Sequence, residues 1–251
     1  MEGQQQQQSF QWGACTDRGC VRMQNEDAYA VDLENGMVVV SDGIGGSERG
    51  AQASEIVVRM LPQMFANRMR ALSSPTDEGL RSALRSAVSD LSDQLHAKTN
   101  GYSGCHSMGA TVVAVVVRHA LIHVVHMGDS RAYLLQAGQL KRLTADHSVV
   151  GILERRHELS PQAARHHGAA GQLTRFVGMP IPAIPDVSSV AVQGGDSVLL
   201  CTDGLTTTLE DETMAVILRR KLIPQEASRQ LVDAAIAAGG PDNVTALVLD
   251  W

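Results

Sequence analysis

The stretch Met37-Val38-Val39-Val40-Ser41-Asp42-Gly43-Ile44-Gly45-Gly46 joins an apolar run of strand length to an acidic, glycine-rich turn. Glycine beside the aspartate lets the backbone approach closely, so the carboxylate at this strand end can serve as an oxygen ligand. Residues 197–204 repeat the design, and the acidic turn Pro241-Asp242-Asn243 leads into the last apolar run. Carboxylates that meet repel each other unless cations neutralise them. The pattern therefore indicates a site for hard cations such as Mg²⁺ or Mn²⁺.

Valine-rich runs and amphipathic stretches predict grouped strands and paired helices. The runs of strand length lie at residues 10–16, 28–32, 37–41, 110–118, 121–127, 131–136, 187–192, 197–202 and 244–249. The stretches expected to be helical lie at residues 51–69, 77–97, 161–167, 210–220 and 224–238. Because these elements do not alternate as βαβ units, we expect an α+β fold in which antiparallel sheets carry helices on their outer faces. Residues 148–184 are expected to form a mobile insertion over the surface.

Composition and charge exclude several classes of protein. The chain has 251 residues, of which 44% are hydrophobic, and its formal net charge of −6 leaves no basic face for a nucleic acid. No uncharged apolar stretch has the length of a membrane span, and the N-terminus lacks a secretory signal. Four cysteines without a C-x-x-C pair are expected to be free thiols in a reducing compartment. We therefore expect a cytoplasmic protein with a disordered, Gln-rich tail at residues 1–9.

The segment Gly128-Asp129-Ser130-Arg131 suggests an alternative, because Gly-Asp-Ser opens the nucleophile block of one class of serine esterases. That class has an aliphatic residue after the serine and a late Asp-x-x-His. Here an arginine follows, and the last histidine, His167, lies well before the C-terminus. The G-x-S-x-G elbow of other serine hydrolases is also missing. We therefore do not favour an esterase, and we expect structural or solvated roles for the histidines.

Eight short motifs, taken in order, resemble the metal-dependent protein phosphatases of type 2C, the PPM family. The motifs are Thr16-Asp17-x-Gly19-x-x-Arg22-x-x-Asn25-Glu26-Asp27, Asp42-Gly43-x-Gly45-Gly46, Gly109-Ala110-Thr111, Gly128-Asp129-Ser130-Arg131-x-Tyr133, Leu143-Thr144-x-Asp146-His147-Ser148, Leu173-Thr174-Arg175-x-x-Gly178, Thr202-Asp203-Gly204-Leu205 and Asp242-Asn243-x-Thr245. The resemblance implies a four-layer αββα sandwich, in which two antiparallel β-sheets are flanked by pairs of helices. It also implies that residues 10–251 form a single phosphatase domain, with a flap insertion at about 148–184.

The resemblance implies a binuclear centre of two Mn²⁺ or Mg²⁺ ions. Asp42 is expected to bridge the ions, and the Gly43 carbonyl, Asp203 and Asp242 complete the inner shell. Asp129 matches a position that helps hold a weaker third ion together with Asp203.

Four further positions complete the implied site. Glu26 and Asp27 match outer-shell residues that reach the ions through water, and Arg22 matches the arginine that binds the substrate phosphate. Some members of the family carry a histidine after the first Asp-Gly and use it as a general acid. This chain has Ile44 there. Because isoleucine cannot donate a proton, leaving-group protonation is expected from a metal-bound water or from solvent.

The implied function is that of a protein serine/threonine phosphatase, which hydrolyses phosphoserine and phosphothreonine by attack of a metal-activated water. Arg22 and Asp42 are the implied catalytic residues. The alternative is a catalytically silent phosphoprotein-binding module on the same fold, which the intact acidic set disfavours. Phosphoprotein substrates and a cognate Ser/Thr protein kinase are the expected partners, the kinase by family analogy only. We expect a monomer.

Overall fold

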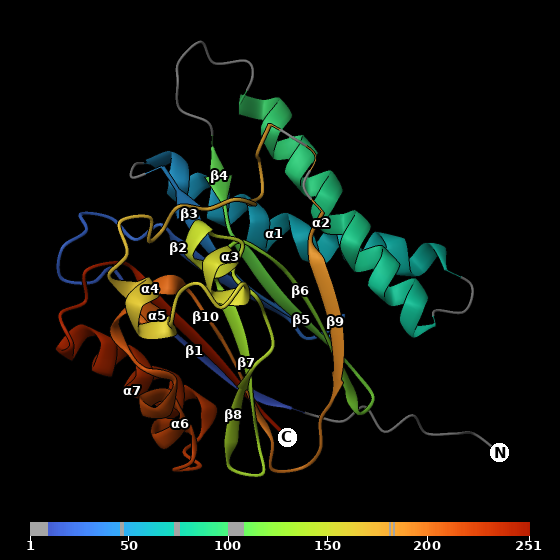
Figure 1. The fold of residues 1–251 in the computed structure, drawn as a ribbon. Coiled ribbons are helices and arrows are strands. Elements are labelled where there is room, and N and C mark those ends of the chain that lie inside the picture. The colour runs from blue at the N-terminus through green and yellow to red at the C-terminus, as the bar shows by residue number, and fades with distance from the viewer. Residues whose placement is uncertain (1–9, 46–47, 73–75, 100–107, 181, 183) are drawn as a thin grey trace.

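The structure is a computed structural model that describes residues 10–45, 48–72, 76–99, 108–180, 182 and 184–251 (Figure 1). The Gln-rich tail at residues 1–9, predicted to be disordered, lies outside the described residues. So does Cys105, whereas Cys15, Cys20 and Cys201 are free thiols, as expected.

Two antiparallel sheets form the centre of the molecule, and strands from distant parts of the chain alternate within them. The first sheet contains, in spatial order, β1 (Gln11–Asp17), β11 (Val244–Asp250), β10 (Ser197–Cys201), β7 (Arg131–Gln136) and β8 (Gln139–Arg142). The second sheet contains β2 (Asp27–Asp32), β3 (Met37–Ile44), β5 (Val112–Arg118), β6 (Leu121–Met127) and β9 (Asp186–Ala191), and β4 (Gly109–Ala110) pairs with β3.

Helices cover the outer face of each sheet (Figure 1). The second sheet carries α1 (Glu48–Ala71) and α2 (Asp77–Thr99). The first sheet carries α5 (Asp203–Thr208), α6 (Asp211–Leu218) and α7 (Pro224–Ala237). Between β8 and β9 the chain forms α3 (Val149–Arg155) and α4 (Pro161–Arg165). The predicted four-layer αββα sandwich is confirmed.

Burial on both faces explains why the central strands are nearly continuous apolar runs. Successive side chains of a strand point to opposite faces of the sheet. In β3, Met37 and Val39 therefore pack in the core shared with α1 and α2, whereas Val38 and Val40 pack in the core between the sheets. All four have no exposed area. This arrangement anchors β3 from both sides and holds its acidic end in a fixed place.

Several elements differ from the sequence-based expectation. The expected strand at 110–118 is interrupted at Thr111. Its N–H still donates to the Asp42 carbonyl (2.8 Å), but the Asp42 N–H donates to the Thr111 hydroxyl (3.0 Å) and not to the Thr111 carbonyl. The elements β8, α3 and α5 are not predicted by the sequence, because each is too short for its periodicity to stand out. Among the described helices, none is both long enough and apolar enough to cross a membrane.

Candidate metal centre

The predicted acidic residues come together from both sheets at one end of the sandwich. Asp42 lies near the end of β3, where the acidic turn begins. Asp27 is its direct partner on β2 in the antiparallel pair. Asp203 is the first residue of α5, Asp242 precedes β11, and Asp129 lies in the turn between β6 and β7. The sandwich thus brings together carboxylates that are more than 200 residues apart in the chain.

These carboxylates line a cavity of about 340 Å³. Its charged and polar lining comprises Arg22, Glu26, Asp42, Gly43, Thr111, Asp129, Asp203, Asp242 and Asn243. Five carboxylates therefore face a single arginine in the lining. Asp27 is not part of the lining, and its Oδ2 accepts hydrogen bonds from the hydroxyls of Thr202 (2.8 Å) and Thr245 (2.7 Å). Asp27 thus lies outside the lining, where these two hydroxyls hold it opposite Asp42.

Burial and mutual repulsion make it costly to ionise these groups together. Loss of hydration, followed by repulsion from the neighbouring carboxylates, raises the pKa of Asp42 and of Asp129 well above the ordinary value. Burial, with repulsion from Asp242, raises the pKa of Asp203 to about 6. Burial also raises the pKa of Asp27 to about 7, although its two threonine hydrogen bonds act in the opposite direction. The site is therefore electrostatically incomplete without added positive charge.

Two carboxylate oxygens point to the same conclusion. The Oδ1 atoms of Asp27 and Asp203 are buried, and within the described part of the chain neither has a hydrogen-bond partner. A buried polar atom without a partner is costly, so such atoms are rare unless something else binds them. Clustered carboxylate oxygens are the ligands that Mg²⁺ and Mn²⁺ prefer. The residues present therefore fit a site for two such ions.

Gly43 allows β3 to lie against the start of α1. A side chain at Gly43 would overlap the backbone of Gly50, in the first turn of that helix. The Gly43 N–H donates to the Glu26 carbonyl (3.1 Å), which joins β3 to the end of the loop before β2. Gly43 lines the cavity. Beside it lies Ile44, the half-buried apolar residue that stands where some members of the family carry a histidine.

Arg22 lies at the rim of the cavity, where it pairs with Asp242. Its Nη2 lies 2.6 Å from Asp242 Oδ2, and its side chain is 46% exposed. The loop that carries it is fixed by the Cys20 N–H, which donates to the Gly240 carbonyl (2.8 Å) in the turn before Asp242. The guanidinium is therefore held beside the carboxylates while part of it still faces solvent.

Asn243 holds this loop in place through its side-chain amide, a role that the sequence analysis did not assign. Its Nδ2 donates to the carbonyls of Arg18 and Gln24 (both 2.8 Å), and its Oδ1 accepts from the Glu26 N–H (2.8 Å). Asn243 is only 5% exposed, and its bond to Glu26 is buried, so water cannot replace that bond, whereas the two bonds to the loop carbonyls are partly buried. Its place after Asp242 in the last motif was the available signal, but nothing in the sequence shows which backbone groups it binds.

We expect Asn243→Ala to lower the free energy of unfolding by about 2–4 kcal/mol, because three backbone groups lose their partner in a buried place. Denaturant unfolding of the metal-free protein measures the change. Asn243→Asp is the matched control, since it keeps the oxygen that accepts from Glu26 and loses both donors. An alanine variant as stable as the wild type would show that the amide does not support the loop.

Hydroxyl groups fix the other acidic turns. Thr111 Oγ1 accepts from the Asp42 N–H (3.0 Å) and lies 2.6 Å from Ser130 Oγ. Ser130 is 1% exposed, so it supports the turn that carries Asp129 and is not presented as a nucleophile. The esterase alternative therefore has no support in this geometry.

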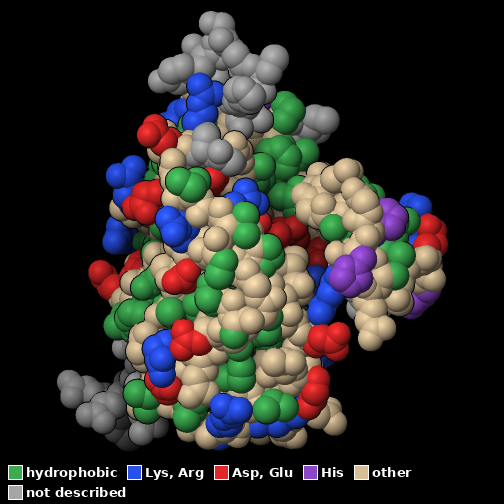
Figure 2. Space-filling model, turned by 90° about the vertical axis from the view of Figure 1, so that its left-hand side faces the viewer, with side chains coloured by type: hydrophobic (Ala, Val, Ile, Leu, Met, Phe, Trp, Pro, Cys, Tyr) green, Lys and Arg blue, Asp and Glu red, His purple; other side chains and the backbone are tan. Residues whose placement is uncertain are grey.

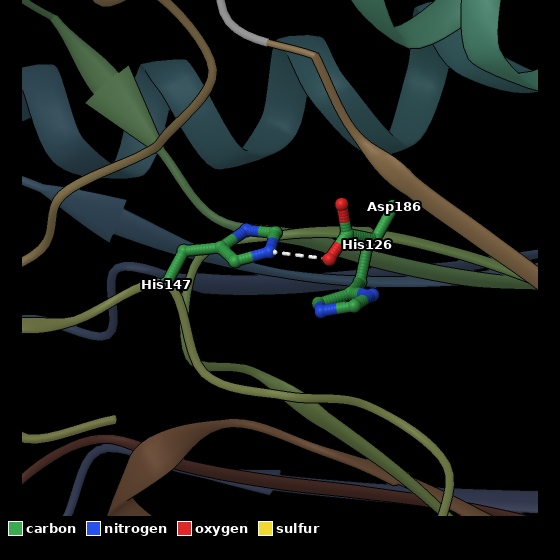
Figure 3. A group of neighbouring side chains, drawn as sticks. All are labelled: His126, His147 and Asp186. Carbon is green, nitrogen blue, oxygen red and sulfur yellow. Dashed lines mark hydrogen bonds and ion pairs between the residues drawn. The ribbon is translucent and has the colours of Figure 1, made fainter. Parts of the chain in front are cut away.

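Two histidines and an aspartate form a second cluster beside the turn of Asp129 (Figure 3). His126, His147 and Asp186 each offer a ligand atom, and these atoms lie within 4.8 Å of one another. The His126 and His147 rings are stacked, with centroids 4.6 Å apart. By distance alone, this cluster could hold a metal ion.

The hydrogen bonds of His147 argue against a metal there. Its Nδ1 accepts from the Gly128 N–H (3.2 Å), so in the neutral ring Nε2 carries the proton and donates to Asp186 Oδ2 (3.1 Å). Burial, helped by neighbouring His126, lowers the pKa of His147 to about 4, which keeps the ring neutral at pH 7. The Nε2 lone pair that a metal needs is thus not available. The cluster has the structural role that we expected for the histidines.

The comparisons with known proteins agree with this geometry. The sequence model of the family described as protein phosphatase 2C matches residues 21–238. The serine/threonine phosphatase stp of Listeria welshimeri is 34% identical over 239 residues, which cover 94% of this chain and 93% of that protein. The chain belongs to the protein phosphatase 2C family.

Solved structures show the same fold. Serine/threonine phosphatase Stp1 from Staphylococcus aureus is similar with a TM-score of 0.88 and 27% identity, over 100% of this chain and 99% of that chain. The catalytic domain of the serine/threonine protein phosphatase PstP, in complex with two manganese ions, is similar with a TM-score of 0.78 and 30% identity, over 96% and 97% of the two chains. The predicted class, a metal-dependent protein serine/threonine phosphatase, is confirmed.

Proposed function

We propose that this chain removes phosphate from phosphoserine and phosphothreonine in proteins at the cavity lined by Asp42, Asp203 and Asp242. The observation that carries the proposal is the set of mutually repelling carboxylates, with buried oxygens that lack partners in the described part of the chain. Two manganese ions in the related PstP structure support it. The intact acidic set leaves the silent binding module without support.

The proposed ligands divide into two groups. Asp42, the Gly43 carbonyl, Asp203 and Asp242 would hold two Mn²⁺ or Mg²⁺ ions. Asp129, together with Asp203, would hold a weaker third ion. When bound, these ions would offset the negative charge of the site and lower the pKa of a coordinated water towards neutrality.

Residues around the ions have supporting roles in this proposal. Glu26 and Asp27 would contact the ions through bound water. Asp27 is close enough for this role because it is the strand partner of Asp42. Arg22 would bind two oxygens of the substrate phosphate, which suits its planar guanidinium at the rim. Ile44 offers no proton, so the leaving group would take its proton from water in the cavity.

Activity with and without metal tests the proposal directly. With Mn²⁺, the purified protein is expected to hydrolyse a phosphothreonine peptide, and excess EDTA should reduce turnover to background. A calorimetric titration with MnCl₂ should show binding in the absence of any substrate. Turnover that persists in EDTA, or no heat on titration with Mn²⁺, would reject the metal centre.

Arg22→Ala should raise KM for a phosphopeptide by roughly tenfold and change kcat much less, because the lost contacts bind phosphate in the ground state as well as in the transition state. Steady-state kinetics with Mn²⁺ measure both constants, and Arg22→Lys should give an intermediate KM. Because Arg22 also pairs with Asp242, calorimetry should show Mn²⁺ affinity in the alanine variant that is unchanged or higher. An unchanged KM would exclude the role in phosphate binding.

We further propose that residues 10–251 act as one phosphatase domain, with residues 148–184 as a flap segment beside the metal centre. A Ser/Thr protein kinase with shared substrates, a cytoplasmic location and a monomeric state complete the proposal. They are supported by family analogy and by the composition of the chain.

A further inference from the structure

A second and larger cavity, of about 630 Å³, adjoins the metal centre. Asp129, Gly171 and Asp203 line both cavities, so the two hollows meet at the carboxylates. One wall comes from the flap segment, residues 148–184, and the opposite wall comes from α5 and the start of α6. Figure 2 shows acidic side chains at the base of the hollow between the body of the molecule and the lobe at its right.

We propose that this second cavity receives the residues beside the phosphorylated residue of a protein substrate, and that it favours a basic side chain about three positions away. The inference rests on the proposed phosphatase function, because the chain beside a phosphoresidue can enter this cavity only if its phosphate is bound at the metal centre. When the phosphate is bound at the ions beside Asp203, the substrate chain must continue along one of the two cavities. The larger cavity lies beside α5.

The preference for a basic residue follows from the charges on the α5–α6 wall. Glu210, Asp211 and Glu212 line that wall consecutively, and all three are exposed. Glu212 pairs with Arg219 (2.6 Å), and Glu210 lies 3.7 Å from Arg165. The Asp211 carboxylate accepts from the uncharged hydroxyl of Tyr133 (3.2 Å). The wall therefore keeps excess negative charge, to which a cationic side chain of the substrate could bind.

The arginines that line the cavity cancel only part of this excess. Arg165, on the flap wall, lies near Glu210, whereas Arg131 on β7 and Arg142 on β8 are engaged with another carboxylate. Arg131 binds the buried Asp146 through Nε (3.0 Å) and Nη2 (2.7 Å), and Arg142 also pairs with Asp146. Arg142 in addition lies 3.8 Å from Glu154. The charge of Arg131 and Arg142 is thus directed mainly at Asp146, and Arg131 reaches the α5–α6 wall only through the hydroxyl of Tyr133 (3.1 Å).

The length of α5 sets the spacing. From Asp203 to Glu210 the chain passes through the short helix α5 and two extended residues, Leu209 and Glu210. At about 1.5 Å per helical residue and about 3.3 Å per extended residue, this path spans at most about 14 Å. An extended substrate advances about 3.3 Å per residue. A phosphate bound at the ions beside Asp203 would therefore place the third or fourth residue along its chain near Glu210 and Asp211.

Acidic residues in a first helical turn also stabilise the helix dipole, so the experiment must separate the two roles. The helix α2 offers a matched control, because Asp77 and Glu78 begin it in the same way, on the outer layer of the other sheet. The variants are the double substitutions Glu210→Gln with Asp211→Asn, and Asp77→Asn with Glu78→Gln. Each removes two exposed charges from a helix start.

The substrates are phosphothreonine peptides that carry Arg, Gln or Glu at the third position on either side, assayed with Mn²⁺. In the wild type we expect Arg to be favoured on one side of the phosphothreonine. There kcat/KM for the Arg peptide should exceed that for the Glu peptide by roughly tenfold, the effect that two exposed ion pairs can produce. The Glu210/Asp211 variant should lose most of this ratio, while the Asp77/Glu78 variant keeps it. All three proteins should hydrolyse p-nitrophenyl phosphate equally, and added salt should reduce the wild-type ratio.

Several outcomes would overturn the inference. A wild type without a charge preference, or an equal ratio in the Glu210/Asp211 variant, would show that the wall does not select the substrate. An equal loss in the Asp77/Glu78 variant, or a lower rate on p-nitrophenyl phosphate, would assign the effect to net charge or to the metal centre. If the wild type hydrolysed neither the Gln peptide nor p-nitrophenyl phosphate, the phosphatase function itself would fail.

Discussion

Asp42→Asn is expected to reduce the turnover of p-nitrophenyl phosphate with Mn²⁺ to background, a loss of about 10³-fold or more. Such a loss corresponds to roughly 4 kcal/mol of activation free energy. The reason is that Asp42 stands between the carboxylates of both sheets and is the proposed bridge of the two ions. Initial rates at saturating Mn²⁺, with calorimetry to follow metal binding, measure the effect.

The same substitution should stabilise the metal-free protein. Protein atoms and other carboxylates surround Asp42, which raises its pKa well above the ordinary value, so a neutral amide of the same shape relieves both burial and repulsion. We expect the unfolding temperature in EDTA to rise by about 2–8 °C at pH 7.5, since 1 kcal/mol shifts a chain of this size by about 2–4 °C. Asp77→Asn, at an exposed helix start, is the control. It should leave the rate unchanged and should not raise the unfolding temperature, because it removes a favourable charge from the first turn of α2. A variant that keeps a tenth of the wild-type rate would remove Asp42 from the site.

Much of this site could be predicted from the sequence, because each proposed ligand lies in a recognisable local sequence pattern. Asp42 and Asp203 each precede a glycine at the end of an apolar run, and Asp242 stands in a turn before the last run. A strand buried on both faces gives such a run, and its end fixes where the turn must lie. The order of the motifs then supplied the family and, through it, the layers of the sandwich.

The contacts that position these ligands could not be predicted in the same way. Asn243 meets Arg18 and Gln24 across more than 200 residues, and Thr245 meets Asp27 across a similar span. A side-chain amide or hydroxyl binds whichever backbone or carboxylate group the fold brings near, and no local pattern encodes that partner. For the same reason the sequence could not show that Glu26 and Asp27, predicted together as outer-shell residues, have different surroundings. Glu26 lines the cavity, whereas Asp27 lies outside the lining and accepts from Thr202 and Thr245.

Ionisation of the carboxylate cluster is expected to lower the stability of the metal-free protein as the pH rises from about 4 to about 7. His147, whose pKa is lowered from 6.5 to about 4, contributes in the opposite direction over the lower part of this range. Asp203 and Asp27, with pKa values raised to about 6 and about 7, bind protons in the folded state that the unfolded chain, with an ordinary pKa of 3.8, has already released. Where the folded state binds more protons than the unfolded state, the free energy of unfolding falls as the pH increases. Thermal unfolding in EDTA across this range measures the slope.

Saturating Mn²⁺ should reverse this trend, because cations bind the ionised carboxylates and compete with protons. An ion at 100 times its dissociation constant adds about 2.7 kcal/mol, so two ions should raise the unfolding temperature by roughly 10–20 °C at pH 7.5. The rise should be much smaller at pH 5, where protons already occupy part of the site. In Asp42→Asn the rise should largely disappear at both pH values. A rise of the same size at pH 5 and pH 7.5, or an equal rise in the variant, would mean that manganese stabilises the protein somewhere other than this cluster of carboxylates.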